Sequence, residues 1–128
     1  MISVKNVTKT FEGFTALDDT ALNVPKGSVY GLVGPNGAGK TTLIRHIAGI
    51  YYPDYGEVLI DGEPVWENTS IKERMIHIPD DLSFFPSATI NDLAAYFNGI
   101  YPRFDMGRFE KMKPFFDLDL KRPGLRIN

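Results

Sequence analysis

The sequence predicts an α/β fold in which a glycine-rich loop joins a buried strand to a helix. Three neighbouring stretches support this prediction: the apolar run SVYGLVG (28–34), the loop GPNGAGKTT (34–42) and the periodic stretch KTTLIRHIAG (40–49). Extended patterns dominate the first part of the chain and helical patterns dominate the last part. We therefore expect a mixed α/β core with an antiparallel lobe over residues 1–81 and a helical segment over residues 82–128.

Composition indicates a globular protein and excludes several functional classes. The 128 residues are 43% apolar and 23% charged, ordinary proportions for one domain or two small lobes. A net charge of −2 provides no broad field for nucleic acid, so nucleic acid is not an expected partner. The chain has no cysteine, which excludes disulfides and thiolate metal sites. Its apolar runs are far shorter than the roughly 20 residues of a membrane span, so we expect a cytoplasmic protein.

Alternating apolar residues and turn residues predict the strands of the first part. Residues 2–11 place Ile2 and Val4 at a period of two and are rich in β-branched side chains. A turn then leads to a second extended segment over 15–24, which a Pro-Lys-Gly triplet ends. The apolar run 28–34 follows and is expected to be a buried strand.

Helical periodicity follows the glycine-rich loop. Four apolar residues are expected to share one face of this helix: Leu43, Ile44, Ile47 and Ala48. Gly49 is placed where a glycine commonly caps the end of a helix. The order strand, loop, helix is the context that a phosphate-binding loop requires.

The middle of the chain predicts a connector and short strands. YYPDYG (51–56) is rich in turn residues, and EVLI after it is typical of a strand. Asp61 and Gly62 form a dipeptide that favours a tight hairpin turn. A further strand is expected over MIHIP (75–79).

Two helices are expected in the last part of the chain. The first begins after Thr89, a candidate N-cap, and its apolar residues at helical spacing are Ile90, Leu93, Ala94 and Phe97. The second covers 105–116, with Phe109, Met112 and Phe116 on one side. The aromatic side chains of this region indicate either a core between helices or a docking surface, and the sequence leaves both open.

The loop 34–42 carries the chemistry that the sequence predicts. Its fixed positions match G-x-x-x-x-G-K-[ST], and its three glycines (Gly34, Gly37 and Gly39) allow successive N–H groups to point at an anion. Lys40 is expected to reach the β- and γ-phosphates of a nucleotide and Thr41 to ligate Mg²⁺. Thr42 offers a backbone N–H and a hydroxyl on the α-phosphate side. The sequence therefore predicts a Mg-nucleotide site at the start of the helix.

The stretch GPNGAGKTTLIRHIAG resembles the phosphate loop of the ATP-binding subunits of ATP-binding cassette (ABC) transporters, and the resemblance runs from residue 1 to about residue 119. KNVTKTFEGFTALDDTALNVPKG is similar to the family's first hairpin, and GEVLIDGEPV to its following segment. The resemblance implies the P-loop NTPase fold of an ABC ATPase with an antiparallel β lobe, an incomplete core sheet and the start of a helical subdomain. It implies ATP and Mg²⁺ as ligands.

The resemblance also assigns roles to single residues. Phe11 matches the aromatic residue that stacks on adenine, although core packing would also explain it, and Ala16 would sit beside the nucleotide. The loop residues that would contact ATP are Gly34, Asn36, Gly37, Ala38, Gly39, Lys40, Thr41 and Thr42.

Several polar residues outside the loop have two interpretations. Asp80 stands where the family has a Gln that positions Mg²⁺ and the attacking water, so it is a candidate catalytic residue and metal ligand or, with Asp81, a solvated turn. Asp61 follows an apolar run as a Walker B carboxylate would, but its glycine neighbour favours a hairpin turn. His46 and His77 have no second ligand at a suitable spacing and are expected to be structural.

The resemblance implies a protein that binds Mg-ATP and energises transport by a partner permease at the cytoplasmic face of the membrane. A second ATP-binding subunit is the other expected partner. The signature, Walker B and switch His motifs of the family are not found in the sequence, so we expect nucleotide binding without efficient hydrolysis by this chain alone. The alternatives are a non-hydrolysing nucleotide-binding interaction module and a different P-loop enzyme such as a small kinase.

Overall fold

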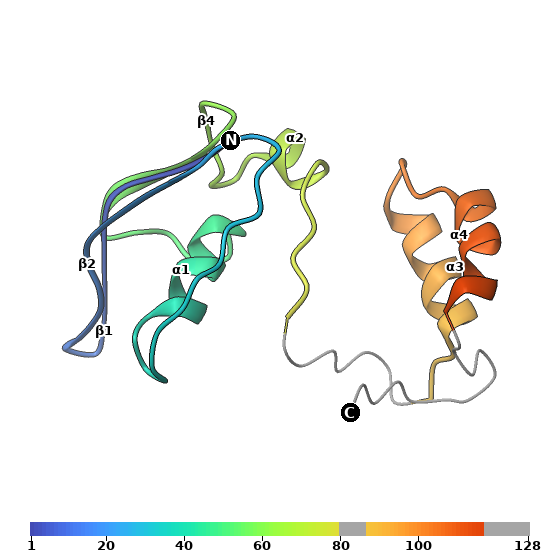
Figure 1. Cartoon of the computed structure of the whole chain (residues 1–128), viewed down its shortest axis with the longest axis horizontal. Coiled ribbons are helices and arrows are strands. Elements are labelled where there is room, and N and C mark those ends of the chain that lie inside the picture. The colour runs from blue at the N-terminus through green and yellow to red at the C-terminus, as the bar shows by residue number, and fades with distance from the viewer. Residues whose placement is uncertain (80–86, 117–128) are drawn as a thin grey trace. The chain divides into compact units, whose positions relative to one another are not determined.

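The computed structural model describes residues 1–79 and 87–116, and the chain divides into two compact units, Met1–His77 and Ile78–Asn128. The first unit contains β1 (Ile2–Phe11), β2 (Phe14–Val24), α1 (Lys40–Ile47), β3 (Tyr55–Ile60), β4 (Glu63–Pro64) and α2 (Thr69–Lys72) (Figure 1). The second contains α3 (Ile90–Ile100), α4 (Met106–Met112) and a 3₁₀ turn, η1 (Lys113–Phe115). Each unit is described by itself.

The strands form one antiparallel sheet in the order β2-β1-β3-β4. At one end of the sheet Ile2 pairs with Val24 of β2 and with Ile60 of β3. The turn between β3 and β4 has positive φ at both Asp61 (52°) and Gly62 (85°), the geometry that Asp-Gly favours in a two-residue hairpin. The predicted strands over 2–11, the second segment and 57–60 are confirmed, and so is the hairpin turn.

One face of this sheet is covered by α1, which contacts β2 and β3 (Figure 1). The core of the unit is made of apolar side chains from the strands, α1, α2 and the segment between β4 and α2. Its buried members are Val4, Val7, Leu17, Leu43, Val58, Val65 and Ile71. Burial of a side chain of this kind stabilises a fold by about 1.5–3 kcal/mol, so this small cluster holds the first unit together.

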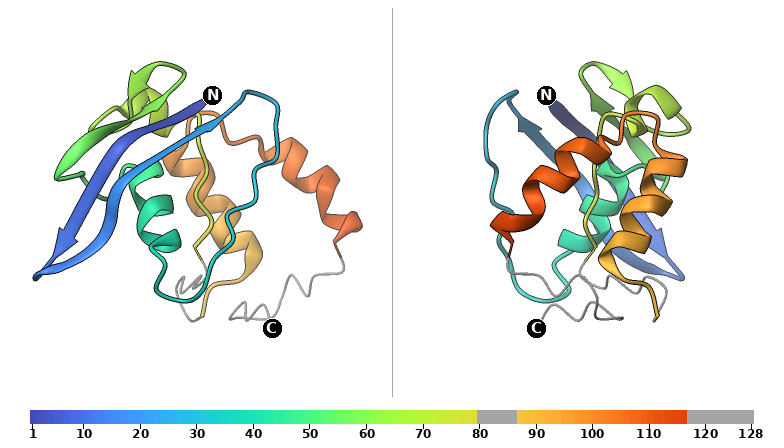
Figure 2. Two further views of the ribbon diagram at one scale, coloured as in Figure 1. Left: turned by 60° about the vertical axis from the view of Figure 1, so that its left-hand side comes forward. Right: turned by 90° about the vertical axis from the view of Figure 1, so that its right-hand side faces the viewer.

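Two predicted strands are wrong within the described residues. Residues 28–34 run as an extended segment without strand pairing into the loop before α1 (Figure 2), and the side chains of Val29 and Val33 are almost completely exposed. Residues 75–79 also lie outside the sheet, and Ile76 is 90% exposed. Apolar runs of this kind become buried strands only where neighbouring strands satisfy their backbone groups. The described antiparallel sheet is formed by other segments and offers them no such neighbour.

Helix α1 begins and ends as the sequence predicts, but its buried face is rotated. Gly49 follows the C-cap with φ 66°, so the expected glycine cap is confirmed. Leu43 and His46 are buried, whereas Ile44 is 41% exposed. Placing Ile44 on the buried face was therefore wrong. The stripe that packs on the sheet follows i, i+3, i+4 spacing from Leu43 and includes a histidine, which a purely apolar pattern overlooks.

The second unit is a helical hairpin whose first helix has a complete capping box. The Thr89 hydroxyl accepts a hydrogen bond from the Asp92 N–H (3.2 Å), and the Asp92 carboxylate accepts one from the Thr89 N–H (2.9 Å). The predicted N-cap is thus confirmed. The second predicted helix is shorter than 105–116, because α4 ends at Met112 and continues as the 3₁₀ turn η1 around Pro114.

Aromatic rings of α3, the connector and α4 pack on one another. Phe104 of the connector lies between the other two rings, with its centroid 6.4 Å from that of Phe97 in α3 and 6.2 Å from that of Phe109 in α4. Packing within the helical hairpin therefore accounts for these three rings. Over residues 1–79 and 87–116, every helix falls short of the length and apolar character of a membrane span.

Candidate functional site

The glycine-rich loop of the first unit takes a backbone path that other residues disfavour. Gly37 and Gly39 both have φ 84°, in the left-handed region, and Gly39 is the N-cap of α1. The N–H of Ala38 donates to Pro35 O at 3.2 Å, which closes the turn before the helix. The loop is therefore a tight turn that ends at the first residue of α1.

The start of α1 presents free backbone donors. The first helical hydrogen bond runs from the Leu43 N–H to Gly39 O (2.8 Å), so the N–H groups of Lys40, Thr41 and Thr42 precede the helical ladder. No side chain caps this end, and the first turn contains no acidic residue. Uncapped N–H groups and the positive end of the helix dipole favour an anion at this place.

The side chain of Lys40 folds back over the loop. Its ammonium donates to Gly34 O and to Pro35 O, each at 2.6 Å. The positive charge is therefore held against the loop backbone, between the loop's first residues and the start of the helix. If a polyphosphate binds here, the Lys40 ammonium can exchange its two carbonyl acceptors for charged phosphate oxygens, which accept stronger hydrogen bonds.

The end of the loop lies against β2. The register of β1 and β2 shifts by one residue between the pairs Lys9–Leu17 and Thr10–Thr15, which leaves Ala16 as an extra residue in β2. A Cβ on Gly39 would lie only 2.5 Å from Ala16 O. Only glycine can make this approach, so Ala16 and the end of the loop lie side by side.

Phe11, the predicted adenine-stacking residue, lies at the tip of the same hairpin. It pairs with Phe14 across the turn, and 37% of its side chain is exposed. Its ring makes an edge contact with Tyr51, at 5.3 Å between centroids, and the Lys9 ammonium lies 5.4 Å from its centroid. Phe11 is thus a partly exposed ring that contacts Tyr51 and lies near the Lys9 ammonium. Core packing does not account for its exposed part.

An aspartate fixes the strand end that carries Phe11. Asp54 accepts hydrogen bonds from the Lys9 ammonium (2.7 Å) and the Thr10 N–H (2.7 Å), and its own N–H donates to Thr8 O (2.9 Å). The Lys9 hydrogen bond and then the Thr10 N–H hold the pKa of Asp54 below its usual 3.8. The segment after α1 is therefore attached to β1 immediately before Phe11.

We expect this attachment to weaken in acid. Because the pKa of Asp54 is lowered in the folded state, its stabilisation is complete above the ordinary pKa and is lost as the pH falls through the folded value. The melting temperature should therefore drop between about pH 5 and about pH 3, and it should drop less in Asp54→Asn. Asp18→Asn, which removes a carboxylate from β2 of the first unit, is the control. An identical acid response of Asp54→Asn and the native chain would contradict the assignment.

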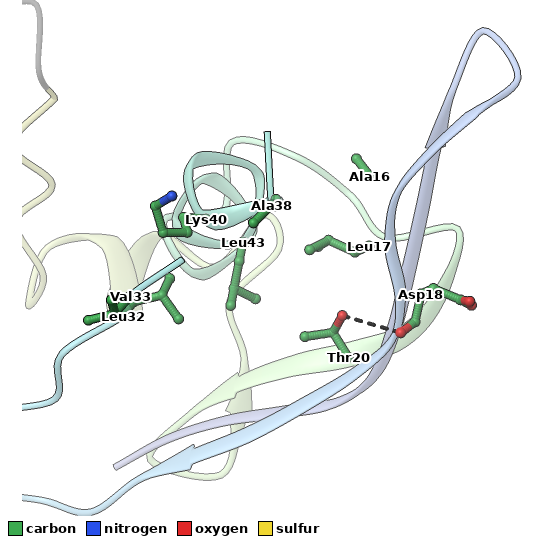
Figure 3. Close-up of a pocket in the computed structure, with 10 residues that line it drawn as sticks. Ala16, Leu17, Asp18, Thr20, Leu32, Val33, Ala38, Lys40 and Leu43 are labelled. Carbon is green, nitrogen blue, oxygen red and sulfur yellow. Dashed lines mark hydrogen bonds between the residues drawn. The ribbon is translucent and has the colours of Figure 1, made fainter. Parts of the chain in front are cut away.

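A pocket of about 270 Å³ lies between β2, the end of the loop and α1 (Figure 3). Its lining residues are Ala16, Leu17, Asp18, Thr20, Leu32, Val33, Ala38, Gly39, Lys40 and Leu43. Three of the loop residues predicted as nucleotide contacts, Ala38, Gly39 and Lys40, therefore border the same hollow as Ala16. Most of the lining is apolar, which suits the non-phosphate part of a ligand.

The remaining candidate residues lie either at the loop or outside the described part of the chain. Asn36, Ala38 and Thr41 are exposed at the loop, where a ligand can reach them. Asp80 lies outside the described residues, and so does Asp81. In the part of the chain that is described, no three His, Asp or Glu side chains are grouped as a metal site would require.

Asp61 and His46 have structural contacts. Asp61 accepts a hydrogen bond from the Met1 amino group at 2.6 Å, and this bond lowers the pKa of its carboxyl. His46 Nδ1 lies 2.8 Å from Thr42 O, and the ring is fully buried; within the described residues its Nε2 has no hydrogen-bond partner. Both observations agree with the expectation that these residues belong to the fold.

The family model described as ABC transporter matches residues 17–121 of the chain. The chain belongs to the ABC transporter family.

Several curated ABC proteins are similar to this chain. The ABC transporter ATP-binding protein YtrB of Bacillus subtilis is 35% identical over 106 residues, which cover 83% of this chain and 36% of YtrB. The spermidine/putrescine import ATP-binding protein PotA of Nitrosomonas eutropha is 39% identical over 97 residues, covering 75% of this chain and 26% of PotA. The chain thus spans about a third or less of the length of these relatives.

Solved structures of ABC ATP-binding proteins share the fold. A putative ABC transporter ATP-binding protein from Pyrococcus furiosus superposes with a TM-score of 0.75 at 22% identity, over 95% of this chain and 60% of that one. A dimeric ATP-binding cassette in a post-hydrolysis state, bound to ADP and Pi, gives a TM-score of 0.70 at 28% identity, over 88% and 53%. These structures confirm the predicted α/β class for this part of an ABC ATPase.

The contacts that support Phe11 are not predicted by the sequence of this ABC family member. YYPDYG was interpreted only as a connector, yet Tyr51 and Asp54 both contact the end of β1. An aromatic residue directly after the predicted helix was the available signal. Its partner could not be inferred, because the contact joins residues 40 positions apart.

Proposed function

We propose that this chain binds Mg-ATP through residues 34–42, as the nucleotide-binding part of an ABC transporter ATPase. The observation that carries the proposal is the combination at the start of α1: a left-handed glycine loop, uncapped N–H groups and the Lys40 ammonium beside them. These donors and this charge suit a triphosphate. The contacts proposed in the loop are Gly34, Asn36, Gly37, Ala38, Gly39, Lys40, Thr41 and Thr42.

The residues also fit the metal and the base that the family implies. Thr41 is exposed at the start of α1, where its hydroxyl can serve as a protein ligand of Mg²⁺. Mg²⁺ bound there would neutralise charge on the β- and γ-phosphates. Phe11 offers a partly exposed ring for adenine, and Ala16 lies beside the loop. Asp80 is proposed as a further metal ligand and catalytic residue because of its position in the sequence.

In the whole transporter we propose that ATP binding by this part energises transport by a partner permease. PotA and the ribose/galactose/methyl galactoside relatives are named as import ATP-binding proteins, which supports a permease as the partner. The similar cassette bound to ADP and Pi is a dimer, which supports a second ATP-binding subunit. The proposed location is the cytoplasmic face of a membrane. For residues 1–128 alone we propose binding without efficient hydrolysis.

Titration with ATP tests the base contact. Phe11→Ala should weaken ATP binding by about 1–3 kcal/mol, the value of one base stacked on one aromatic ring, which is roughly 5- to 150-fold in Kd. Phe14→Ala is the matched control, because Phe14 pairs with Phe11 on the hairpin and is more exposed. Equal losses in the two variants would rule out a specific stack on Phe11.

A further inference from the structure

Tyr51 is anchored to the end of the helix that begins at the phosphate loop. The N–H groups of Ile50 and Tyr51 both donate to Arg45 O, at 2.8 and 3.3 Å. The Arg45 Nη1 group donates to the Tyr51 hydroxyl at 2.9 Å, and the guanidinium carbon lies 5.6 Å from the ring centroid. The ring also makes an edge contact with buried His46 at 5.7 Å. Backbone and side chain therefore both hold Tyr51 on α1.

The Tyr51 ring also contacts Phe11. The two ring planes are inclined at 61°, with centroids 5.3 Å apart, the edge contact that aromatic pairs favour. Phe11 stands at the end of a hairpin and is partly exposed, so the contact with Tyr51 helps to restrict its rotamer. Tyr51 is consequently the link between the proposed base-stacking ring and α1.

A second contact from the same segment restricts Phe11 from its backbone side. Asp54 binds the Lys9 ammonium and the Thr10 N–H, and that ammonium lies over the Phe11 ring. Residues 51–54 therefore hold both the ring and the strand end that carries it. The loop proposed to bind phosphate and the ring proposed to bind the base are joined through α1 and the segment 48–54 after it.

We propose that Tyr51 is a positioning residue for the nucleotide base. It fixes the Phe11 ring at a set distance from the start of α1, so that one ligand can reach the ring and the loop together. The inference rests on the proposed function and deepens it, because it concerns how the base half of the site is built. A ring held in place before binding loses less conformational freedom when the base stacks on it.

The test compares ATP with inorganic tripolyphosphate, which has the phosphates and no base. Tyr51→Ala should weaken ATP binding roughly 3- to 10-fold, as expected for the loss of one aromatic pair, and leave tripolyphosphate binding unchanged. Tyr51→Leu keeps apolar volume without the aromatic edge and should weaken ATP binding as Tyr51→Ala does. Tyr51→Phe should retain most of the affinity for ATP. Tyr52→Ala is the matched control, since its ring contacts Trp66 rather than Phe11.

A double-mutant cycle separates positioning from general stability. In the Phe11→Ala background, Tyr51→Leu should have no further effect on ATP binding, because the ring that it positions is gone. Additive losses, equal losses for ATP and tripolyphosphate, or unchanged ATP affinity in Tyr51→Leu would each overturn the inference. Absence of ATP binding by the native chain would instead refute the proposed function itself.

Discussion

Lys40→Ala is expected to abolish measurable ATP binding. The ammonium is already placed at the loop by its bonds to Gly34 O and Pro35 O, and it is the charged group that the first turn of α1 offers to phosphate. Two charge-assisted hydrogen bonds contribute about 3–6 kcal/mol together, so Kd should rise roughly 10²- to 10⁴-fold. Isothermal titration with Mg-ATP measures the change directly.

The control for Lys40→Ala is Lys111→Ala, which removes an exposed lysine from α4 in the other unit. It makes the same change in net charge and should leave Kd unaltered. The two carbonyl bonds of Lys40 are exposed, so Lys40→Ala should melt within a few degrees of the native chain. ATP affinity that survives in Lys40→Ala would remove the loop as the phosphate site.

Gly39→Ala is expected to damage both the fold of the loop and its binding of ATP. The new methyl group would lie 2.5 Å from Ala16 O and 3.0 Å from Leu17, at a residue with φ 84°. The left-handed backbone alone costs about 1–2 kcal/mol for a non-glycine residue. Since the obstructing atom belongs to the backbone of β2, either the loop or the strand must move. A total destabilisation above about 2 kcal/mol should appear in denaturant unfolding.

Gly37→Ala separates the cost of the left-handed backbone from the cost of the steric clash with β2. Gly37 has the same φ of 84°, but a Cβ there would have no neighbour within 4 Å. This variant should show only the backbone cost of about 1–2 kcal/mol and should keep more of its ATP affinity than Gly39→Ala. If both variants lost the same stability, the close approach of Ala16 to the loop would have no energetic role.

Local signals predicted the elements whose partners lie close in sequence. The hairpin at Asp61 and Gly62 and the cap at Thr89 follow from turn and cap chemistry that acts within a few residues. The apolar runs 28–34 and 75–79 have equally good local patterns and are not strands, because strand pairing depends on neighbours that a local pattern does not describe.

The same division holds for the site. The loop could be located from its glycines and its lysine, because these residues shape the loop through contacts within a few positions of sequence. Tyr51 and Asp54 could not be found, since their roles come from contacts with β1 across about 40 positions of sequence. Ala16 is placed beside the nucleotide by resemblance alone; the structure shows it as the extra residue of β2, next to Gly39.

The run 28–34, which leads into the loop, has no strand pairing in the described sheet. Gly34 follows residues that belong to no strand, so the bond to the Lys40 ammonium is a principal restraint on its carbonyl. A polypeptide strand that paired with this run would fix part of the loop backbone, which a bound nucleotide would otherwise have to order. Thermodynamic reciprocity then requires ATP to tighten that association by the same factor by which the association tightens ATP.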